Sequence, residues 1–161
     1  MTPSPKLLSP KLLLVLVVGC SAEPEAAEPV GMVGRVTRIT DGDTIHVEID
    51  GQDERVRYIG IDTPETEHSP RGAQAFGAEA MEANRRLVEN RTVRLVLDVE
   101  PRDRYGRLLA YVYLDETFVN AELVREGFAK QLTVPPNVRH ADEFRRLERE
   151  AREAQRGLWA R

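Results

Sequence analysis

The sequence predicts one α+β domain, in which a five-stranded β-barrel is covered by three α-helices. Its 161 residues suit a single domain of ordinary size. Five short segments are β-prone, the first three of them consecutive and separated by turn signals, and three other segments carry apolar residues at helical spacing. A barrel is the natural closure for five short strands because it leaves few free edges, and the helices can cover its open end.

The first three strands are expected to form a meander of hairpins. Gly34–Thr40 alternates imperfectly between apolar and polar residues, Thr44–Ile49 alternates cleanly, and Arg55–Ile61 follows. Asp-Gly pairs at 41–42 and 50–51 mark the tight turns between them. Each of these strands should therefore pair with the next.

The rest of the domain mixes helices and strands. The spacing predicts helices over Gly77–Asn90, Val119–Lys130 and Ala141–Gln155, and strands over Thr92–Val99 and Leu108–Leu114. Glycines should end the second and third helices, at or just after Gly127 and at Gly157. Trp159 is expected to pack back onto the domain.

The first thirty residues differ in composition from the rest. Lys6 and Lys11 surround a proline-containing start, and the apolar run Leu12–Val18 then ends at Gly19 and Cys20. This pattern is typical of a secretory signal, and the run is far shorter than the ~20 residues that a membrane-spanning helix needs. We expect a signal peptide over 1–19, an Ala/Glu/Pro tether over 20–30 and the folded domain over 31–161.

Val17-Val18-Gly19-Cys20 resembles a bacterial lipobox, with Val17 in place of the more usual leucine. The resemblance implies that Cys20 becomes the lipidated first residue of an extracytoplasmic, envelope-anchored protein. The alternative is an ordinary signal peptide cut nearby, which would leave the protein secreted.

Composition excludes several classes of protein. With 41% hydrophobic and 31% charged residues, the chain is neither wholly disordered nor a polytopic membrane protein. A single cysteine excludes an intrachain disulfide framework and a zinc site built on several cysteines. The formal net charge of -4 is opposite in sign to that of most nucleic-acid binders. A nucleic-acid function would therefore need a locally positive site on an acidic body.

Polar residues of types that can bind a metal or take part in catalysis gather in four places, namely Asp41–Thr44, Arg57, Asp62–Glu67 and Asp103–Arg107. Taken singly, each is explained as a turn, a solvated strand residue or a strand exit. Together, carboxylates with a backbone carbonyl suit Ca²⁺. Arginines can hold a phosphate and stabilise its transition state, and a further carboxylate can orient or deprotonate water. The set is sufficient for metal-assisted hydrolysis of a phosphodiester.

These motifs, in this order, resemble the staphylococcal nuclease (thermonuclease) family. The resemblance runs from about Gly34 to Trp159 and includes Ile39–Thr44, Arg57, Ile61–Thr66, Asp103–Tyr111 and Val119-Asn120. It implies an OB-fold barrel and Ca²⁺-dependent cleavage of DNA and RNA at the phosphorus–5′-oxygen bond, which leaves 3′-phosphate ends. The expected substrate is single-stranded or locally melted nucleic acid, and we expect a monomer.

The resemblance also implies a Ca²⁺ site and a group that acts on water. Asp43 and Asp62 would bind the ion through their carboxylates, and Thr63 through its main-chain carbonyl. Glu65 would be the general base, or the group that orients the attacking water. Asp41 would shape the turn beside the site.

On the substrate side, the resemblance implies roles for basic and aromatic residues. Arg57 and Arg107 would contact the scissile phosphate, and Arg104 and Tyr105 would contact the substrate around it. Residues 57 and 62 point to opposite faces of a regular strand because they are five apart. They can share a site only if the strand bends, and Gly60 is the expected place.

The sequence departs from the family in the loop at 131–137. That loop lacks the two tyrosines that the family often carries there, so we expect weaker base stacking, at ~1–3 kcal/mol for each lost contact.

Two non-enzymatic hypotheses remain beside the nuclease. One is a nucleic-acid- or protein-binding OB-fold module. The other is an envelope lipoprotein that keeps the site for calcium-linked stability or ligand binding.

Overall fold

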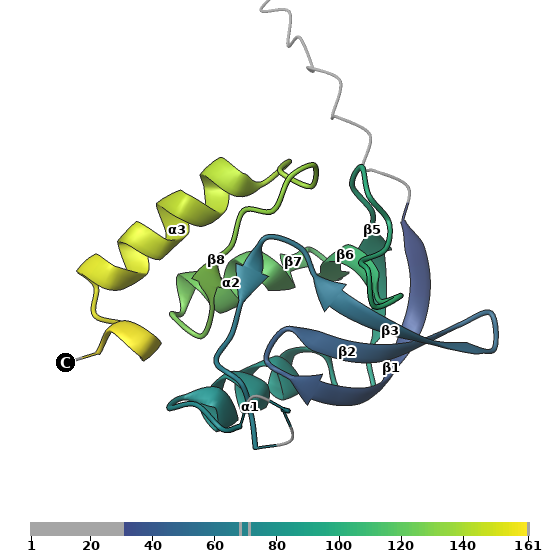
Figure 1. Cartoon of the computed structure of the whole chain (residues 1–161), viewed down its shortest axis with the longest axis horizontal. Coiled ribbons are helices and arrows are strands. Elements are labelled where there is room, and N and C mark those ends of the chain that lie inside the picture. The colour runs from purple at the N-terminus through teal and green to yellow at the C-terminus, as the bar shows by residue number, and fades with distance from the viewer. Residues whose placement is uncertain (1–30, 68, 71, 161) are drawn as a thin grey trace, which may run out of the picture.

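The computed structural model describes residues 31–67, 69–70 and 72–160 (Figure 1). The expected signal peptide, the tether and Cys20 lie outside the described residues. Within the described part of the chain, no helix combines the length and apolar character needed to cross a bilayer.

A closed barrel of five strands confirms the predicted fold class. β1 (Met32–Asp41), β2 (Thr44–Ile49) and β3 (Gln52–Tyr58) form the expected antiparallel meander. β5 (Thr92–Val96) pairs antiparallel with both β1 and β6 (Leu108–Leu114). The barrel closes where β6 runs parallel to β3. Closure leaves no long unpaired edge in the barrel itself.

Three helices and several short elements complete the domain. α1 packs against β1, α2 against β6, and α3 against α2 (Figure 1). The helices are α1 (Gly77–Val88), α2 (Val119–Arg125) and α3 (Ala141–Glu153). The short elements are β4 (Ile61–Asp62), which pairs with β8 (Lys130–Gln131), β7 (Thr117–Phe118), which pairs with β6, and a 3₁₀ turn over Gly157–Trp159.

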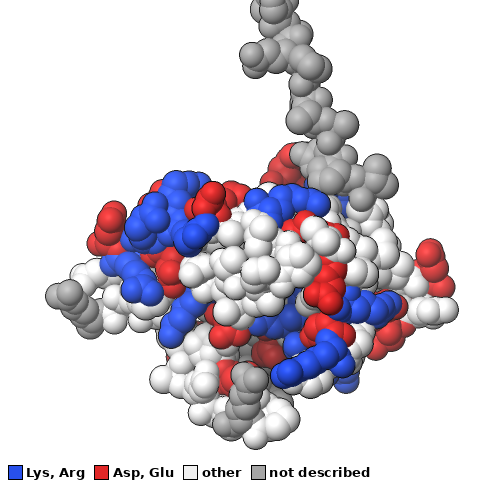
Figure 2. Space-filling view, turned by 45° about the horizontal axis from the view of Figure 1, so that its top comes forward, with Lys and Arg blue, Asp and Glu red and all other residues white. Residues whose placement is uncertain are grey.

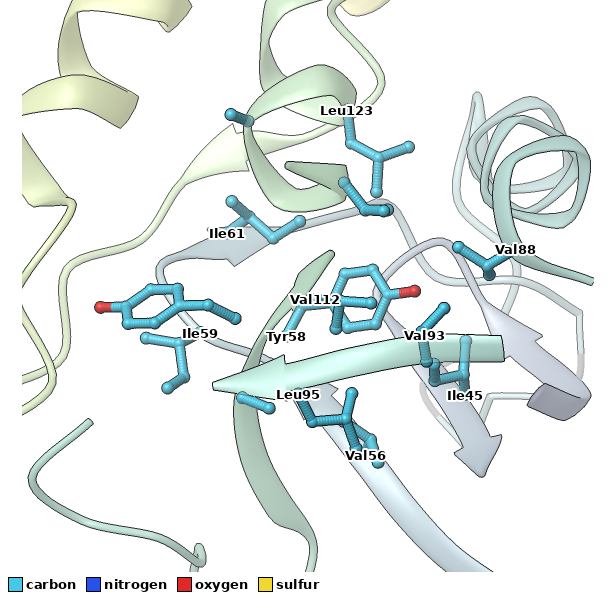
Figure 3. Packing of buried hydrophobic residues seen from close by; sticks show 14 of the residues in the cluster. Ile45, Val56, Tyr58, Ile59, Ile61, Val88, Val93, Leu95, Val112 and Leu123 are labelled. Carbon is cyan, nitrogen blue, oxygen red and sulfur yellow. The ribbon is translucent and has the colours of Figure 1, made fainter. Parts of the chain in front are cut away.

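The core fills the barrel and the space beneath the helices (Figure 3). On β2, Ile45 and Val47 are fully buried and Glu48 is exposed, as the alternation predicted. Tyr58 is also buried, and its hydroxyl donates a hydrogen bond of 2.9 Å to Asn84 Oδ1. Burial raises the pKa of Tyr58 above its ordinary value. A buried hydroxyl is tolerated here because it has a partner.

The predicted third strand is wrong at its end. It stops at Tyr58, and the chain turns at Gly60 before continuing as β4. Gly60 has φ +80°, and a Cβ on it would lie 2.4 Å from the ring of Phe144. Glycine is required here for two reasons, the left-handed backbone and the close approach of α3. The bend expected at this residue is therefore confirmed.

The predicted second helix is too long. α2 ends at Arg125, and Gly127 follows with φ +77°. The Phe128 N–H returns to the carbonyl of Leu123 at 2.8 Å, and the Gly127 N–H to that of Val124 at 3.0 Å. This is a Schellman-type ending, which turns the chain away from the helix axis toward β8.

A buried asparagine at the start of α2 supports the bend after β3. Asn120 Nδ2 donates to the Ile59 carbonyl at 2.9 Å, and its Oδ1 accepts the Val112 N–H at 2.9 Å. The side chain is fully buried, so it satisfies two main-chain groups that water does not reach. It thereby ties α2 and β6 to the residue before Gly60.

Gly60→Ala should destabilise the protein more than Gly51→Ala. Gly51 also has a positive φ of 78°, but a Cβ there meets nothing within 4 Å. Gly51→Ala should therefore cost only the left-handed strain of about 1–2 kcal/mol. Gly60→Ala adds a clash with Phe144 and should cost about 1–3 kcal/mol more. Urea unfolding of both variants measures the difference, and equal losses would contradict this account of the bend.

Candidate active site

The turn between β1 and β2 is joined closely to the segment after β4. The Asp43 N–H donates to Asp41 Oδ1 at 3.1 Å, which shapes the turn. Asp43 is buried; its Oδ2 accepts the Thr63 N–H at 2.8 Å and its Oδ1 accepts the Thr44 hydroxyl at 3.1 Å. A Cβ on Gly42 would lie 2.8 Å from the Thr63 side chain. The glycine therefore allows the contact that places Asp43 beside Thr63.

Arg57 crosses the bend after β3 and joins two carboxylates. Its Nη1 donates to the carbonyls of Tyr58 and Ile61, at 2.9 and 2.8 Å. Its Nη2 lies 3.1 Å from Asp43 Oδ2 and 2.9 Å from Asp62 Oδ1. The bend thus brings residues 57 and 62 together, as the site required. Asp43 and Asp62 converge on one position from two sides of the chain.

Excess negative charge is buried at the turn. Burial, together with the charge of Asp43, raises the pKa of Asp41 to about 7, although Arg57 acts in the opposite direction. Like charges that lie close together disfavour ionisation, as does removal from water. The negative charge of Asp41 and Asp43 at the turn is therefore not fully balanced by the positive charge of Arg57.

The backbone of Glu65 is fixed by the approach to α1. Its N–H donates to Gln74 Oε1 at 3.1 Å, and its carbonyl accepts the Gln74 N–H at 2.9 Å. A Cβ on Gly77, the first residue of α1, would lie 2.2 Å from the Glu65 carbonyl oxygen. The helix start is therefore packed directly against this residue, which fixes where its side chain leaves the main chain.

A second loop, before β6, presents Arg107. Asp103 Oδ1 accepts the N–H groups of Tyr105 and Arg107, at 2.9 and 3.0 Å, and its Oδ2 accepts Arg107 Nε at 2.7 Å. Burial acts to raise the pKa of Asp103, but its bonds to Arg107 outweigh this effect and lower it below its ordinary value. Gly106, at φ +78°, allows the tight turn. The loop thus holds Arg107 by both main chain and side chain.

One cavity of ≈ 520 Å³ collects the expected residues. It is lined by Asp43, Arg57, Asp62, Thr63, Glu65, Tyr105 and Arg107, and also by Thr40, Asp41, Thr44, Arg55, Thr66, Ser69, Pro70 and Leu132. Arg104 is not among them. Its guanidinium lies 4.8 Å from the ring centre of Tyr105, and its Nη2 bonds to the Tyr105 hydroxyl at 2.7 Å. Arg104 therefore reaches the cavity only through Tyr105, which is 65% exposed.

Two residues of the cavity lining, Arg55 and Leu132, were not among the site residues expected from the sequence. Arg55 lies two residues before Arg57 and therefore faces the same side of β3, a period-2 signal that could have identified it. Leu132, in the loop without tyrosines, contributes an exposed apolar side chain. Figure 2 shows acidic and basic side chains interleaved over the face of the molecule that it presents.

The donor set suits a hard cation. Among the described residues, no group of three or more His, Cys, Asp or Glu side chains is arranged to hold a metal ion. The carboxylates of Asp43 and Asp62 nevertheless meet at the Arg57 guanidinium, and Asp43 also accepts the Thr63 N–H, so the three proposed ligand residues lie close together. Ca²⁺ accepts carboxylate and carbonyl oxygens and completes its shell with water or phosphate oxygens. These residues therefore fit Ca²⁺ in ligand type.

Comparisons with known proteins show which family this chain matches. Residues 55–161 match the family described as staphylococcal nuclease homologue. The chain is 43% identical over 126 residues to a thermonuclease of Staphylococcus intermedius, covering 78% of this chain and 75% of that protein. It is 37% identical to a thermonuclease of Staphylococcus hyicus over the same shares. It is also 40% identical to endonuclease YncB of Bacillus subtilis, covering 77% of this chain and 60% of that protein.

Asp41→Asn should change how the free energy of unfolding depends on pH, when it is measured in buffer that contains a calcium chelator. A carboxyl whose pKa rises from 3.8 unfolded to about 7 folded keeps its proton longer in the folded state. Its contribution to stability is then lost as pH rises between these values. Asn keeps an Oδ1 acceptor without the charge. The variant should therefore gain stability relative to wild type between about pH 5 and 8, measured by urea unfolding; parallel pH profiles would contradict the assignment.

Proposed function

The chain belongs to the staphylococcal nuclease family, and from this premise we propose that it is a Ca²⁺-dependent nuclease that hydrolyses phosphodiester bonds of DNA or RNA. The observation that carries the proposal is the single cavity shared by two carboxylates, two arginines and Glu65. Relatives named as a thermonuclease and an endonuclease support the nuclease class. Their names leave the metal and the bond cleaved to be argued from the site.

In the proposed reaction, Asp43, Asp62 and the Thr63 carbonyl would hold Ca²⁺. When bound, the ion would supply positive charge next to the scissile phosphate. Asp43 is preorganised for this task because the Thr44 hydroxyl and the Thr63 N–H already fix its oxygens. Asp62 is half exposed, so it can adjust when a cation enters.

Glu65 would accept a proton from the attacking water, or orient that water. The water oxygen would form a bond to phosphorus while the phosphorus–5′-oxygen bond breaks, which leaves a 3′-phosphate and a 5′-oxygen that takes up a proton from solvent to become the hydroxyl. Arg57 and Arg107 would donate hydrogen bonds to the phosphate oxygens, whose charge grows in the transition state. Arg107 is held in place by Asp103. The Nη groups of Arg57 are engaged by two carbonyls and by Asp43 and Asp62, so Arg57 would donate through Nε or exchange one of these partners when the phosphate arrives.

We also propose that the nuclease works outside the cytoplasm. This part rests on the sequence alone, namely the apolar run before Cys20 and the lipobox-like Val17–Cys20. Lipidation of Cys20 would anchor the domain to the cell envelope through the tether at 20–30. Mass spectrometry of the membrane fraction tests it, and an unmodified protein in the medium would instead support simple secretion.

Glu65→Gln should lower cleavage of single-stranded DNA in Ca²⁺ by roughly a hundred- to ten-thousand-fold, because loss of a general base costs about that much. The matched control is Glu67→Gln, the same change at an exposed carboxylate outside the cavity lining. Wild type and the control should cleave in Ca²⁺ and stop in EGTA.

Two results would contradict the proposal. Equal activity of the two glutamine variants would remove Glu65 from the chemistry. Absence of cleavage by a folded wild-type protein that binds Ca²⁺ would favour a binding module or a calcium-stabilised lipoprotein. Circular dichroism of each variant separates loss of function from loss of fold.

A further inference from the structure

A row of basic side chains leads out of the cavity, from the loop before β6 across β3, β2 and β1. Arg38 on β1 pairs with His46 on β2, and His46 pairs with Arg55 on β3. In the β3–β6 ladder, Val56 pairs with Leu108, so extending this register back by one residue sets Arg107 beside Arg55. Both of these arginines line the cavity. At about 4.8 Å between strands, the row spans about 14 Å.

The side chains of this row point outward. Arg38 and Arg55 are exposed, whereas their neighbours Ile39 and Val56 are buried. An irregularity in β1 between Val36 and Arg38 lets Arg38 face solvent. The row therefore lies on the outer face of the β1–β2–β3 meander, which Figure 1 shows as neighbouring strands.

Two arginines of this row, Arg38 and Arg55, form no salt bridge among the described residues. Arg107 is paired with Asp103, and Arg57, two residues after Arg55 on β3, is paired with Asp43 and Asp62. Over the described residues, neither Arg38 nor Arg55 lies within 4.0 Å of a carboxylate oxygen. The charge of Arg38 is partly balanced by Asp53, whose pKa is lowered by its hydrogen bond with His46 and also by Arg38, whereas Arg55 in the cavity lining has no carboxylate within that distance among the described residues.

His46 holds the end of the row in place. Its Nδ1 lies 2.7 Å from Asp53 Oδ2, and its Nε2 lies 2.6 Å from Arg38 Nη2. A carboxylate only accepts and a guanidinium only donates, so the proton is on Nδ1 and Nε2 is the acceptor. The Arg38 guanidinium is therefore tied to β2, on the side that faces Arg55.

The next row of the same face sets a boundary. It consists of Arg35, Glu48 and Asp53, which lie opposite one another across the three strands and together carry more negative than positive charge. A polyanion following the first row would be repelled from the second. The positive strip is thus about one side chain wide, which suits one phosphate backbone and not a broad acidic surface.

We propose that Arg55 and Arg38 form a second phosphate site, which binds the backbone of a single-stranded nucleic acid where it leaves the cavity. The proposal rests on the proposed nuclease function and adds the path of the substrate. The strand would cross β3, β2 and β1 in that order, with the phosphate next to the scissile one at Arg55 and a further phosphate at Arg38. Exposed guanidiniums suit this task because they donate two hydrogen bonds to a phosphate in one plane.

The test is binding of a single-stranded 12-nucleotide DNA to the full chain in EGTA, where no turnover is expected, at several salt concentrations. The double variant Arg38→Ala with Arg55→Ala is compared with Arg35→Ala with Arg149→Ala. The second pair removes the same charge from exposed positions outside the row. Each lost phosphate contact should reduce the slope of log affinity against log salt by about 0.7. We expect the row variant to lose about 1.4 in slope and roughly tenfold in affinity at 0.1 M salt, and the control to keep its slope.

Equal losses in the two double variants would overturn the proposal, since overall charge would then explain them, and so would no loss in either. Circular dichroism of both variants verifies the fold. Cleavage of the same DNA in Ca²⁺ separates this proposal from the one on which it rests. A wild type that cleaves while both variants bind alike overturns only the second phosphate site. A wild type that binds through the row without cleaving overturns only the nuclease.

Discussion

The site depends on one interaction, the Arg57 guanidinium that Asp43 and Asp62 share across the bend after β3. The three residues come from a strand, a turn and the segment beyond the bend, so the contact forms only when all three are in place. Asp43 is almost fully buried, and an unpaired charge there would cost several kcal/mol. Gly60, Gly42 and Asn120 each remove an obstacle to this contact or support it, by turning the chain, admitting Thr63 and holding the Ile59 carbonyl. The packing of the domain and the chemistry of the cavity therefore both depend on the contact of Arg57 with Asp43 and Asp62.

The distribution of charge explains how an acidic chain can act on a polyanion. Total charge governs encounter at long range, whereas the local field governs binding at a site. Here Arg57 and Arg107 are paired with carboxylates, which keeps them in position, whereas Arg55, also in the cavity lining, forms no salt bridge and Arg38 lies two strands further along the sheet. A phosphate backbone would meet Arg38 and Arg55 first and Arg57 and Arg107 at the reacting bond. On this account, the loop with Leu132 in place of an aromatic residue adds little stacking.

Much of the fold was predictable because strong local signals determine it. β2 and β6 have the predicted bounds, and the bend at Gly60 followed from the need to bring residues 57 and 62 together. Apolar spacing extended α2 to Lys130, which is too long, but Gly127 was the glycine expected to end this helix, and the Schellman turn there confirms that part of the prediction. The roles of Asn84 and Asn120 are set by tertiary contacts with partners 26 and 61 residues away, so no periodicity reveals them. The cavity lining includes every expected catalytic, metal-binding and substrate-binding residue except Arg104, whereas Arg55 was not among the expected residues. The expected Ca²⁺ and lipid anchor stay predictions.

The central claim is that Asp43 and Asp62 converge on one cation position beside Arg57. Calorimetric titration of the purified protein with Ca²⁺ tests this directly, with Asp43→Asn, Asp62→Asn and, as a control, Asp50→Asn at the exposed β2–β3 turn. The account predicts one Ca²⁺ bound per chain in wild type and control, and weakening of at least about tenfold in each site variant, since each loses a charged ligand. Unchanged Ca²⁺ binding in Asp43→Asn, or equal weakening in Asp50→Asn, would contradict it.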